Sequence, residues 1–341
     1  MTGALLRLPA LRSDDPLGVL AALGIVELCR SELGVPEEEL GLAWEGIGRP
    51  AQLLAPFESA EALVQALYAA AQTMAAEDRL VPVPVPNFIP PGLSDAERKQ
   101  LKDEKGREPP FDPLRVTQRK AIERYRSLQN ACVGHLGASR WLCALSDQLA
   151  TLPDKEEVQA TPLCVPRTRQ RIPQLYGKTL GAVASDPDLL HAACLAWRRN
   201  RADAGITLDW RAERDAGVTT DGRSGNAAVT GAEWLALQAA PWFRLGGLRG
   251  RPQAWAWWPT GRSGRPRAFV WPVWSQPLDP WAIEVLITHP VVGKVAREQR
   301  ATSETANALR RLGIIAVFRS ERTTLPNSEG PLGSPTLLWP A

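Results

Sequence analysis

The stretch DDPLGVLAALGIVELC, residues 14–29, decides how the fold begins. Its apolar run follows two acids, whereas a secretory signal starts with basic residues, and the run is too short to cross a bilayer. Gly18 and Gly24 do not have the spacing of a phosphate-binding loop, and no strand is expected before them. Because Asp15 suits the N-cap and Pro16 the first helical position, the stretch predicts a buried core helix from Pro16 onward.

Outward from this helix, the sequence predicts helices and short strands in irregular alternation. A strand is expected at 41–46 and a helix at 58–77, which together with the first helix form an N-terminal region, residues 1–80. Residues 81–113 hold eight prolines around a charged middle, and this composition predicts a long loop.

The remaining region, residues 114–341, is basic and rich in tryptophan. Its periodicity predicts helices at 114–150, 186–201, 231–240, 279–289 and 302–312, and its other signals predict extended segments at 162–175, 205–210 and 314–320. Two aromatic segments, 253–259 and 267–274, predict a Trp-rich β-hairpin. The expected fold class is therefore α+β or mixed α/β, with helices packed on small mixed sheets.

The composition is typical of a cytoplasmic protein with a sizeable core. Hydrophobic residues make up 44% of the 341 residues, yet no apolar segment is long enough to predict a membrane span. The five cysteines are odd in number and form no C-x-x-C pair. This pattern predicts reduced thiols, with neither a disulfide framework nor a zinc site.

The charge is distributed unevenly along the chain. Residues 1–105 carry 9 Lys+Arg against 16 Asp+Glu, a net −7, and residues 106–341 carry 31 against 21, a net +10, which together give +3. Of the basic residues, 33 are arginine and 7 are lysine. Arginine binds phosphate through a planar fork, so this bias suits nucleic acid. A GC-rich genome produces the same bias, and composition leaves both explanations open.

The arginines in PRTRQRIP are the most specific candidates for nucleic-acid contact. Arg167, Arg169 and Arg171 alternate in a segment expected to be extended, so their side chains would point to one face about 6.6 Å apart. Other clusters close the helix at 186–201, lie on a helix near 120 or tip the hairpin: Arg198, Arg199, Arg201, Arg119, Lys120, Arg262 and Arg265. For the three that close the helix, the helix dipole is a sufficient structural explanation.

The loop GVTTDGRSGN, residues 217–226, is the candidate for reading bases. Its glycines permit close approach to a groove, and hydrogen-bonding side chains lie between them: Thr219, Thr220, Arg223, Ser224 and Asn226. The alternatives are that the loop is a surface connector, or that the hairpin tip with Arg262 and Arg265 reads bases instead.

The tryptophans favour a core role over base stacking. Eleven of the thirteen lie at or after Trp197. We expect Trp255, Trp257, Trp271 and Trp274, which lie in the expected strands, to pack in the core rather than to form a stacking platform.

No catalytic signature is evident in the sequence. The three histidines, His135, His191 and His289, have no ligand neighbours at metal spacing. The acids Asp203, Asp209, Asp215 and Asp221 recur at about six-residue intervals and would serve a metal-dependent nuclease only if they converged in space. We therefore expect no enzyme activity, no cofactor and no metal, and keep the nuclease as the alternative.

Several segments resemble a known family. The opening block followed by LAWEG (42–46) resembles the start of large subunits of type I-G (formerly I-U) CRISPR Cascade complexes. Three later segments extend the resemblance: TTDGRSGNAAVTGAEWLALQAAPWFRL (219–245), FVWPVWSQPLD (269–279) and VFRSERTTLPNSEGPLG (317–333).

The resemblance implies a DNA-binding subunit of a crRNA-guided antiviral surveillance complex. Such a subunit recognises the protospacer-adjacent motif in target double-stranded DNA, aids duplex opening and R-loop formation, and docks the CRISPR helicase–nuclease without cutting DNA itself. The implied partners are the other Cascade subunits, crRNA, target DNA and the helicase–nuclease, with no membrane. The acidic N-terminal region would then contact protein. A purely structural subunit whose arginines face protein remains the third possibility.

Overall fold

The computed structural model describes residues 3–77, 130, 136–145, 147, 161–163, 172–201, 208–211, 217–218, 224–225, 227–248, 251–259, 266–325 and 328–341. The loop predicted at 81–113, and with it both boundaries of the three predicted regions, lies outside these residues. Within them, helices combine with antiparallel sheets and Trp-rich strands, so the predicted α+β class is confirmed.

The helix predicted from residues 14–29 is confirmed as α1 (Pro16–Ser31), and the side chain of Asp15 caps it by accepting from the backbone N–H of Leu17. The expectation that no strand precedes it is wrong, because β1 (Ala4–Arg12) does. Strand β1 belongs to a three-stranded sheet of order β1-β3-β2, with β2 (Gly41–Trp44) and β3 (Pro50–Ala55). β2 confirms the strand predicted at 41–46.

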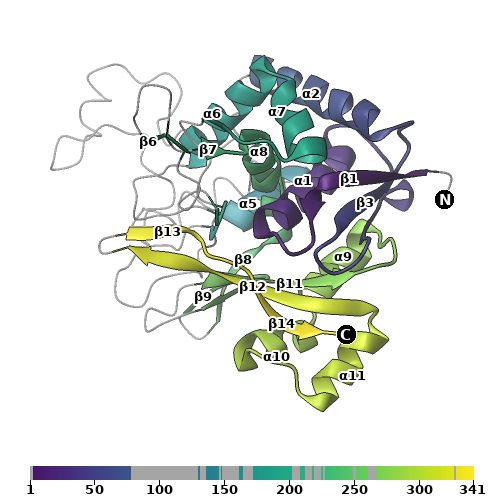
Figure 1. Cartoon of the computed structure of the whole chain (residues 1–341), viewed down its shortest axis with the longest axis vertical. Coiled ribbons are helices and arrows are strands. Elements are labelled where there is room, and N and C mark those ends of the chain that lie inside the picture. Colours follow the sequence, from purple (N-terminus) through teal and green to yellow (C-terminus); the bar gives the residue numbers. More distant parts are fainter. Residues whose placement is uncertain are drawn as a thin grey trace.

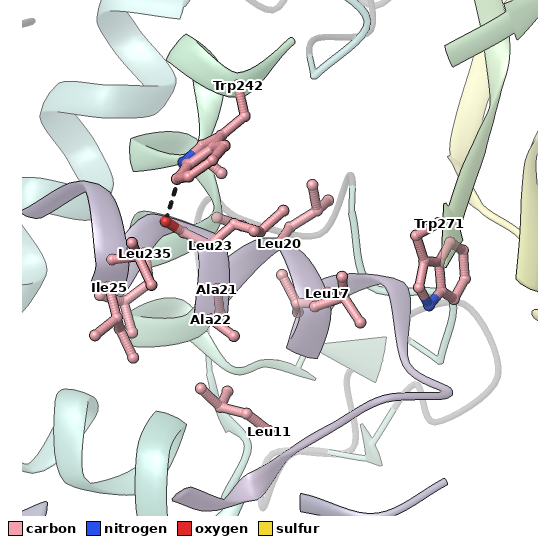
Figure 2. Packing of buried hydrophobic residues seen from close by; sticks show 14 of the residues in the cluster. Leu11, Leu17, Leu20, Ala21, Ala22, Leu23, Ile25, Leu235, Trp242 and Trp271 are labelled. Carbon is pink, nitrogen blue, oxygen red and sulfur yellow. Dashed lines mark hydrogen bonds between the residues drawn. The ribbon is translucent and has the colours of Figure 1, made fainter. Parts of the chain in front are cut away.

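Helix α1 lies at the centre of the molecule. It crosses α8 (Thr230–Gln238), which confirms the helix predicted at 231–240. At the crossing, a Cβ added to Gly24 would lie 1.7 Å from the carbonyl oxygen of Leu235, so the two backbones touch. Figure 2 shows this packing, with the indole N–H of Trp242 donating to the carbonyl oxygen of Leu23 at 3.2 Å.

Further helices surround this pair. They are α2 (Ala60–Ala76), α5 (Leu136–Leu145), α6 (Ile172–Ser185), α7 (Asp188–His191), the π-helical turn Ala192–Ala196 and the 3₁₀ turns Glu37–Glu39 and Ala240–Trp242. α2 confirms the helix predicted at 58–77, and α5 confirms part of the one predicted at 114–150. Three buried faces, those of α1, α2 and α8, join one hydrophobic cluster with the large sheet.

The predicted Trp-rich hairpin is confirmed for residues 257–259 and 266–274, whereas a turn at Trp255 and Ala256 breaks the strand predicted at 253–259. The hairpin belongs to a larger sheet than expected. This seven-stranded sheet has the order β13-β12-β11-β10-β9-β8, with β14 also paired to β12, and all its pairings are antiparallel. Its strands are β8 (Leu245–Leu248), β9 (Arg251–Ala254), β10 (Trp257–Pro259), β11 (Pro266–Trp274), β12 (Ile314–Leu325), β13 (Ser328–Leu332) and β14 (Thr336–Pro340).

The two faces of the large sheet have different neighbours (Figure 1). On the inner face, Trp271 and Trp274 donate to the carbonyl oxygens of Ser13 and Leu42 at 2.9 and 2.6 Å, which joins the two sheets. On the outer face lie α10 (Pro290–Glu298) and α11 (Ser303–Arg311), where Gly293 packs on the ring of Trp258. Helix α9 (Pro280–Ile287) precedes them. α9 and α11 were predicted, and α10 was not.

Three local predictions are wrong. The helix predicted at 186–201 ends at Ala196, because Trp197 adopts a left-handed conformation with φ 48°. The segment predicted as extended to 175 is already helical from Ile172 in α6. The strand predicted at 205–210 is instead a bend and a turn over 208–211, where the chain is described.

Short two-stranded pairings complete the fold. β4 (Asn200–Arg201) pairs with β7 (Ala227–Ala228), and β5 (Gly217–Val218) pairs with β6 (Ser224–Gly225). Across the described ranges, no helix has both the length and the apolar character needed to cross a membrane.

Candidate nucleic-acid interface

Two of the three arginines predicted at the end of the helix at 186–201, Arg198 and Arg199, pair with acids. The backbone turns sharply at Trp197 and places Arg198 beside Asp188, with which it forms an exposed ion pair. Arg199 points inward: its side chain is 16% exposed, and its Nη2 lies 2.7 Å from Oδ2 of Asp209. This geometry indicates a structural role for Arg199.

Asp209 is fully buried, and each of its two carboxylate oxygens accepts a hydrogen bond. Besides Arg199, it accepts a hydrogen bond from the backbone N–H of Arg211 at 2.9 Å. Arg211 in turn pairs with Asp15 and lies over the ring of Trp210, 4.5 Å from its centroid. These contacts link Arg199, Asp209 and Arg211 to the N-cap of α1.

Burial also affects the ionisation of Asp15. Desolvation raises the pKa of its carboxyl group, and the charge and hydrogen bond of Arg211 oppose that rise. An acid so placed serves the fold, since it caps α1 and receives Arg211 from a distant segment.

Most of the other predicted site residues lie outside the described residues. They are Arg119, Lys120, Arg167, Arg169, Arg171, Thr219, Thr220, Arg223, Asn226, Arg262 and Arg265, together with the acids Asp203, Asp215 and Asp221. For Arg201 and Ser224 the backbone is described: Arg201 pairs with Ala227 in β4–β7, and Ser224 pairs with Val218 in β5–β6. Contact of these residues with DNA stays a prediction.

The tryptophans of the hairpin pack in the core, as predicted, with one exception. Trp257, Trp271 and Trp274 are buried. Trp257, Phe269, Trp271 and Phe318 form a continuous aromatic row, with successive ring centroids 5.2, 4.9 and 5.7 Å apart. Trp255 instead lies in the turn between β9 and β10 and is 38% exposed, beneath the guanidinium of Arg244.

A buried ionic cluster connects three helices around Trp242. Glu27 of α1 pairs with Arg30, and Nη2 of Arg140 on α5 lies 3.7 Å from both Glu27 and Glu284 of α9. Glu284 also receives Arg244 at 2.6 Å. Desolvation raises the pKa of Glu27 to about 6 despite the opposing effect of Arg30.

Sequence reasoning missed one group of basic residues, Arg297, Arg300, Arg310 and Arg311, which lie on and between α10 and α11. They escaped notice because they are spread along the chain and form no run. The signal was present in composition, since residues 291–313 hold five Lys+Arg and two Asp+Glu.

The cysteines and acids of the described residues offer no metal centre. No group of three or more His, Cys, Asp and Glu side chains comes together there in a way that would hold a metal ion. Cys29 and Cys194 are buried free thiols, and burial raises the pKa of each to about 12.

Comparison with known proteins finds no match to a family model, to a curated protein or to a solved structure.

Proposed function

We propose that this chain is a non-catalytic DNA-binding subunit of a type I-G CRISPR Cascade complex. In this role it recognises the protospacer-adjacent motif, aids duplex opening and docks the helicase–nuclease. Its partners are the other Cascade subunits, crRNA and target double-stranded DNA.

The observation that carries the proposal is the position of the segments that resemble Cascade large subunits. They are far apart in the sequence and adjacent in the fold. Residues 14–29 contain the N-cap and most of α1, which crosses α8 from the segment 219–245. β2 from LAWEG bonds to the segment 269–279, since Leu42 and Leu278 exchange backbone hydrogen bonds of 3.0 and 3.1 Å.

The last segment completes this arrangement. β11 from 269–279 pairs with β12 from 317–333, with Phe269 opposite Ser320 and Trp271 opposite Phe318. All four segments contribute buried residues to one hydrophobic cluster, as a shared fold would require. Their joint position in one core supports a likeness of the whole fold.

Charge supports the DNA-binding part of the proposal. Residues 106–341 have a net charge of +10, and the described acids of that region neutralise only some of its arginines. A basic excess attracts the phosphate backbone and gives salt-dependent binding.

The nuclease alternative has less support. Of its four acids, only Asp209 has described surroundings, and its two oxygens are engaged by Arg199 and the backbone N–H of Arg211. A carboxylate held in this way would have to break a buried ion pair before binding a metal.

Co-expression tests the proposal. The chain is produced with the other type I-G Cascade subunits and a crRNA, and the purified complex is titrated with duplexes that differ only in the motif. We expect co-purification, motif-dependent binding and no strand cleavage in Mg²⁺ or Mn²⁺ without the helicase–nuclease. Failure to co-purify, or cleavage by the chain alone, would overturn it.

A further inference from the structure

Four arginines on the outer face of the large sheet form no ion pair with any described acid. Arg297 lies in the last turn of α10, Arg300 in the connection to α11, and Arg310 and Arg311 in the last turn of α11. All four are exposed. Within the part of the chain that the structure describes, none of them forms an ion pair, and we call this group the α10–α11 surface.

Elsewhere in the described chain, exposed arginines are mostly neutralised. Arg7 pairs with Glu45, Arg12 with Asp14 and Arg198 with Asp188. On the same face, Lys294 pairs with Glu304, and Arg319 pairs with Glu321. Arg49 and Lys178 also lack ion pairs among described residues, but each lies singly. Among the described residues, the uncompensated positive charge is therefore concentrated on the α10–α11 surface.

Two of the arginines are held over aromatic rings. The guanidinium of Arg297 lies 5.8 Å from the centroid of Trp258, and that of Arg310 lies 5.7 Å from the centroid of Trp339. Arg310 also donates to Oδ1 of Asn307 at 3.2 Å. These contacts limit the freedom of the two side chains, so less entropy is lost when they bind a ligand.

The helix dipole explains only part of this arrangement. Cations in the last turns of α10 and α11 are favourable there, which accounts for three of the four arginines. Arg300 lies outside both helices. The dipole also leaves the outward charge available, because the exposed guanidinium groups form no ion pair among the described residues, although Glu298 follows Arg297 in the chain.

We infer that the α10–α11 surface binds the phosphate backbone of duplex DNA without reading its sequence. The inference rests on the proposed function and names a second contact, separate from the predicted triplet at 167–171. Helix α11 is nine residues, or about 13 Å, long, and one DNA strand carries a charge about every 3.4 Å of axis. Arginines before and at the end of this helix therefore span several phosphates.

The rings beneath the arginines explain why this contact would not read bases. Trp339 is 6% exposed, and Trp258 is partly buried under Arg297, so neither offers a free face for stacking. Arg297 and Arg310, which cover these rings, have little reach towards a base edge in a groove. For these two arginines, attraction between charge and phosphate remains.

A charge-matched pair of variants tests the inference. The variant Arg300→Gln/Arg311→Gln removes two charges from the α10–α11 surface without touching either aromatic ring. The control Arg7→Gln/Arg12→Gln removes two exposed but ion-paired charges from β1. The full-length proteins are titrated with a duplex of unrelated sequence, with the same DNA single-stranded and with RNA, at several NaCl concentrations. Thermal unfolding verifies that each variant is folded.

The expected result is specific to the first variant. Its log–log salt slope for duplex DNA falls by about 1.8, so between about 50 and 200 mM NaCl it loses about twelvefold less affinity than the unmodified protein does. The control keeps the original slope, and Arg300→Lys/Arg311→Lys restores it, because phosphate accepts a point charge.

Other results overturn the inference in distinguishable ways. If the salt slopes of the variant and the control are equal and duplex binding is intact, the α10–α11 surface does not contact duplex DNA, and the proposed function is unaffected. If the salt slope of the variant falls for RNA and not for duplex DNA, the surface binds RNA. Intact DNA binding with loss of a Cascade subunit assigns it to an acidic protein partner. No nucleic-acid binding by the unmodified protein, free or within the complex, removes the proposed function as well.

Discussion

Gly24 lies where the backbones of α1 and α8 cross. A methyl group at this position would prevent the two helices from packing at their present distance. A Cβ there would lie 1.7 Å from the carbonyl oxygen of Leu235 and 2.7 Å from its carbonyl carbon. Backbone atoms cannot turn aside as a flexible side chain can, so the helices themselves would have to separate. The space, and not the conformation of Gly24, therefore requires glycine.

We expect Gly24→Ala to lower the free energy of unfolding by at least about 3 kcal/mol, since overpacking here moves two core helices. Gly181→Ala in α6 is the matched control, because that glycine is exposed and nothing lies within 4 Å of the added Cβ. The control should be neutral or stabilise by up to about 1 kcal/mol. Urea denaturation of both variants measures the difference, and equal stabilities would contradict the crossing.

Glu27 should make stability depend on pH. Its pKa is raised to about 6 in the folded chain from an ordinary value of 4.5, with desolvation as the main cause. The folded state therefore holds the proton more tightly, and the contribution of Glu27 to the free energy of unfolding falls as pH rises from 4.5 through 6. The change is about 2 kcal/mol.

The variant Glu27→Gln isolates this effect. Arg30, Arg140, Glu37 and Glu284, which share the cluster, remain in both proteins. The difference in unfolding free energy between the unmodified protein and the variant should therefore shift by about 2 kcal/mol in favour of the unmodified protein as pH falls from 7 to about 4.5. A difference that stays constant with pH would show that Glu27 titrates normally.

At the scale of elements, the hydrogen bonds of the buried indoles tie the two sheets together. Trp271 donates to the carbonyl oxygen of Ser13, whereas Trp257, in the same aromatic row, has no hydrogen-bond partner for Nε1 among the described residues. Changing either residue to Phe removes a similar volume from the core. We expect Trp271→Phe to cost about 1–3 kcal/mol more than Trp257→Phe, because it also leaves a buried carbonyl unsatisfied.

Thermal or urea unfolding of the two Phe variants measures this difference. Trp257 makes its own contacts with Phe243, Phe269 and Arg322, so the comparison requires that both variants keep native far-UV circular dichroism. Equal losses of stability would mean that the bond to Ser13 adds nothing to the packing of the ring.

Elements with strong local signals were predicted from sequence, and the others depend on tertiary contacts. α1 has an N-cap, a proline at its first position and an apolar face, so it was predicted correctly. α6 was missed because its prolines were interpreted as extended chain, yet Pro173 lies in the first helical turn, where proline is tolerated. The left-handed Trp197 has no local signal, and it ended the helix predicted to reach 201.

The candidate site was less predictable than the fold. A run of arginines in the sequence does not reveal where the neutralising acids lie, and Arg199 finds Asp209 ten residues away in a buried pair. The exposed arginines of α10 and α11 differ because no ion pair among the described residues neutralises them, whereas Arg7, Arg12 and Arg198 are paired. The ion pairs formed across the fold distinguish Arg199 from the arginines of α10 and α11, and the density of charge along the chain does not.

At the scale of the whole molecule, the N-terminal region shares the core of the rest. α1 crosses α8, and Ser13 and Leu42 receive the indoles of Trp271 and Trp274. Removing residues 1–80 would therefore unfold the molecule. Whether this acidic region binds Cascade subunits has to be tested with surface substitutions, of which Arg7 and Glu45 on the β1–β3–β2 sheet are suitable examples.

We expect the loop 217–226 to read the motif, so that this loop gives specificity while phosphate contacts elsewhere give affinity. Its two ends pair as β5 and β6, with Gly217 opposite Gly225, and Asn226 directly precedes β7 and α8 in the core. We expect Asn226→Ala to lose about 1–3 kcal/mol of discrimination between the correct and wrong motifs. Affinity for unrelated DNA should change little, because no charge is removed. Titration of the complex with every motif variant measures both quantities. The control is Arg262→Gln/Arg265→Gln at the hairpin tip, and a loss of discrimination there with none in Asn226→Ala would assign motif reading to the tip.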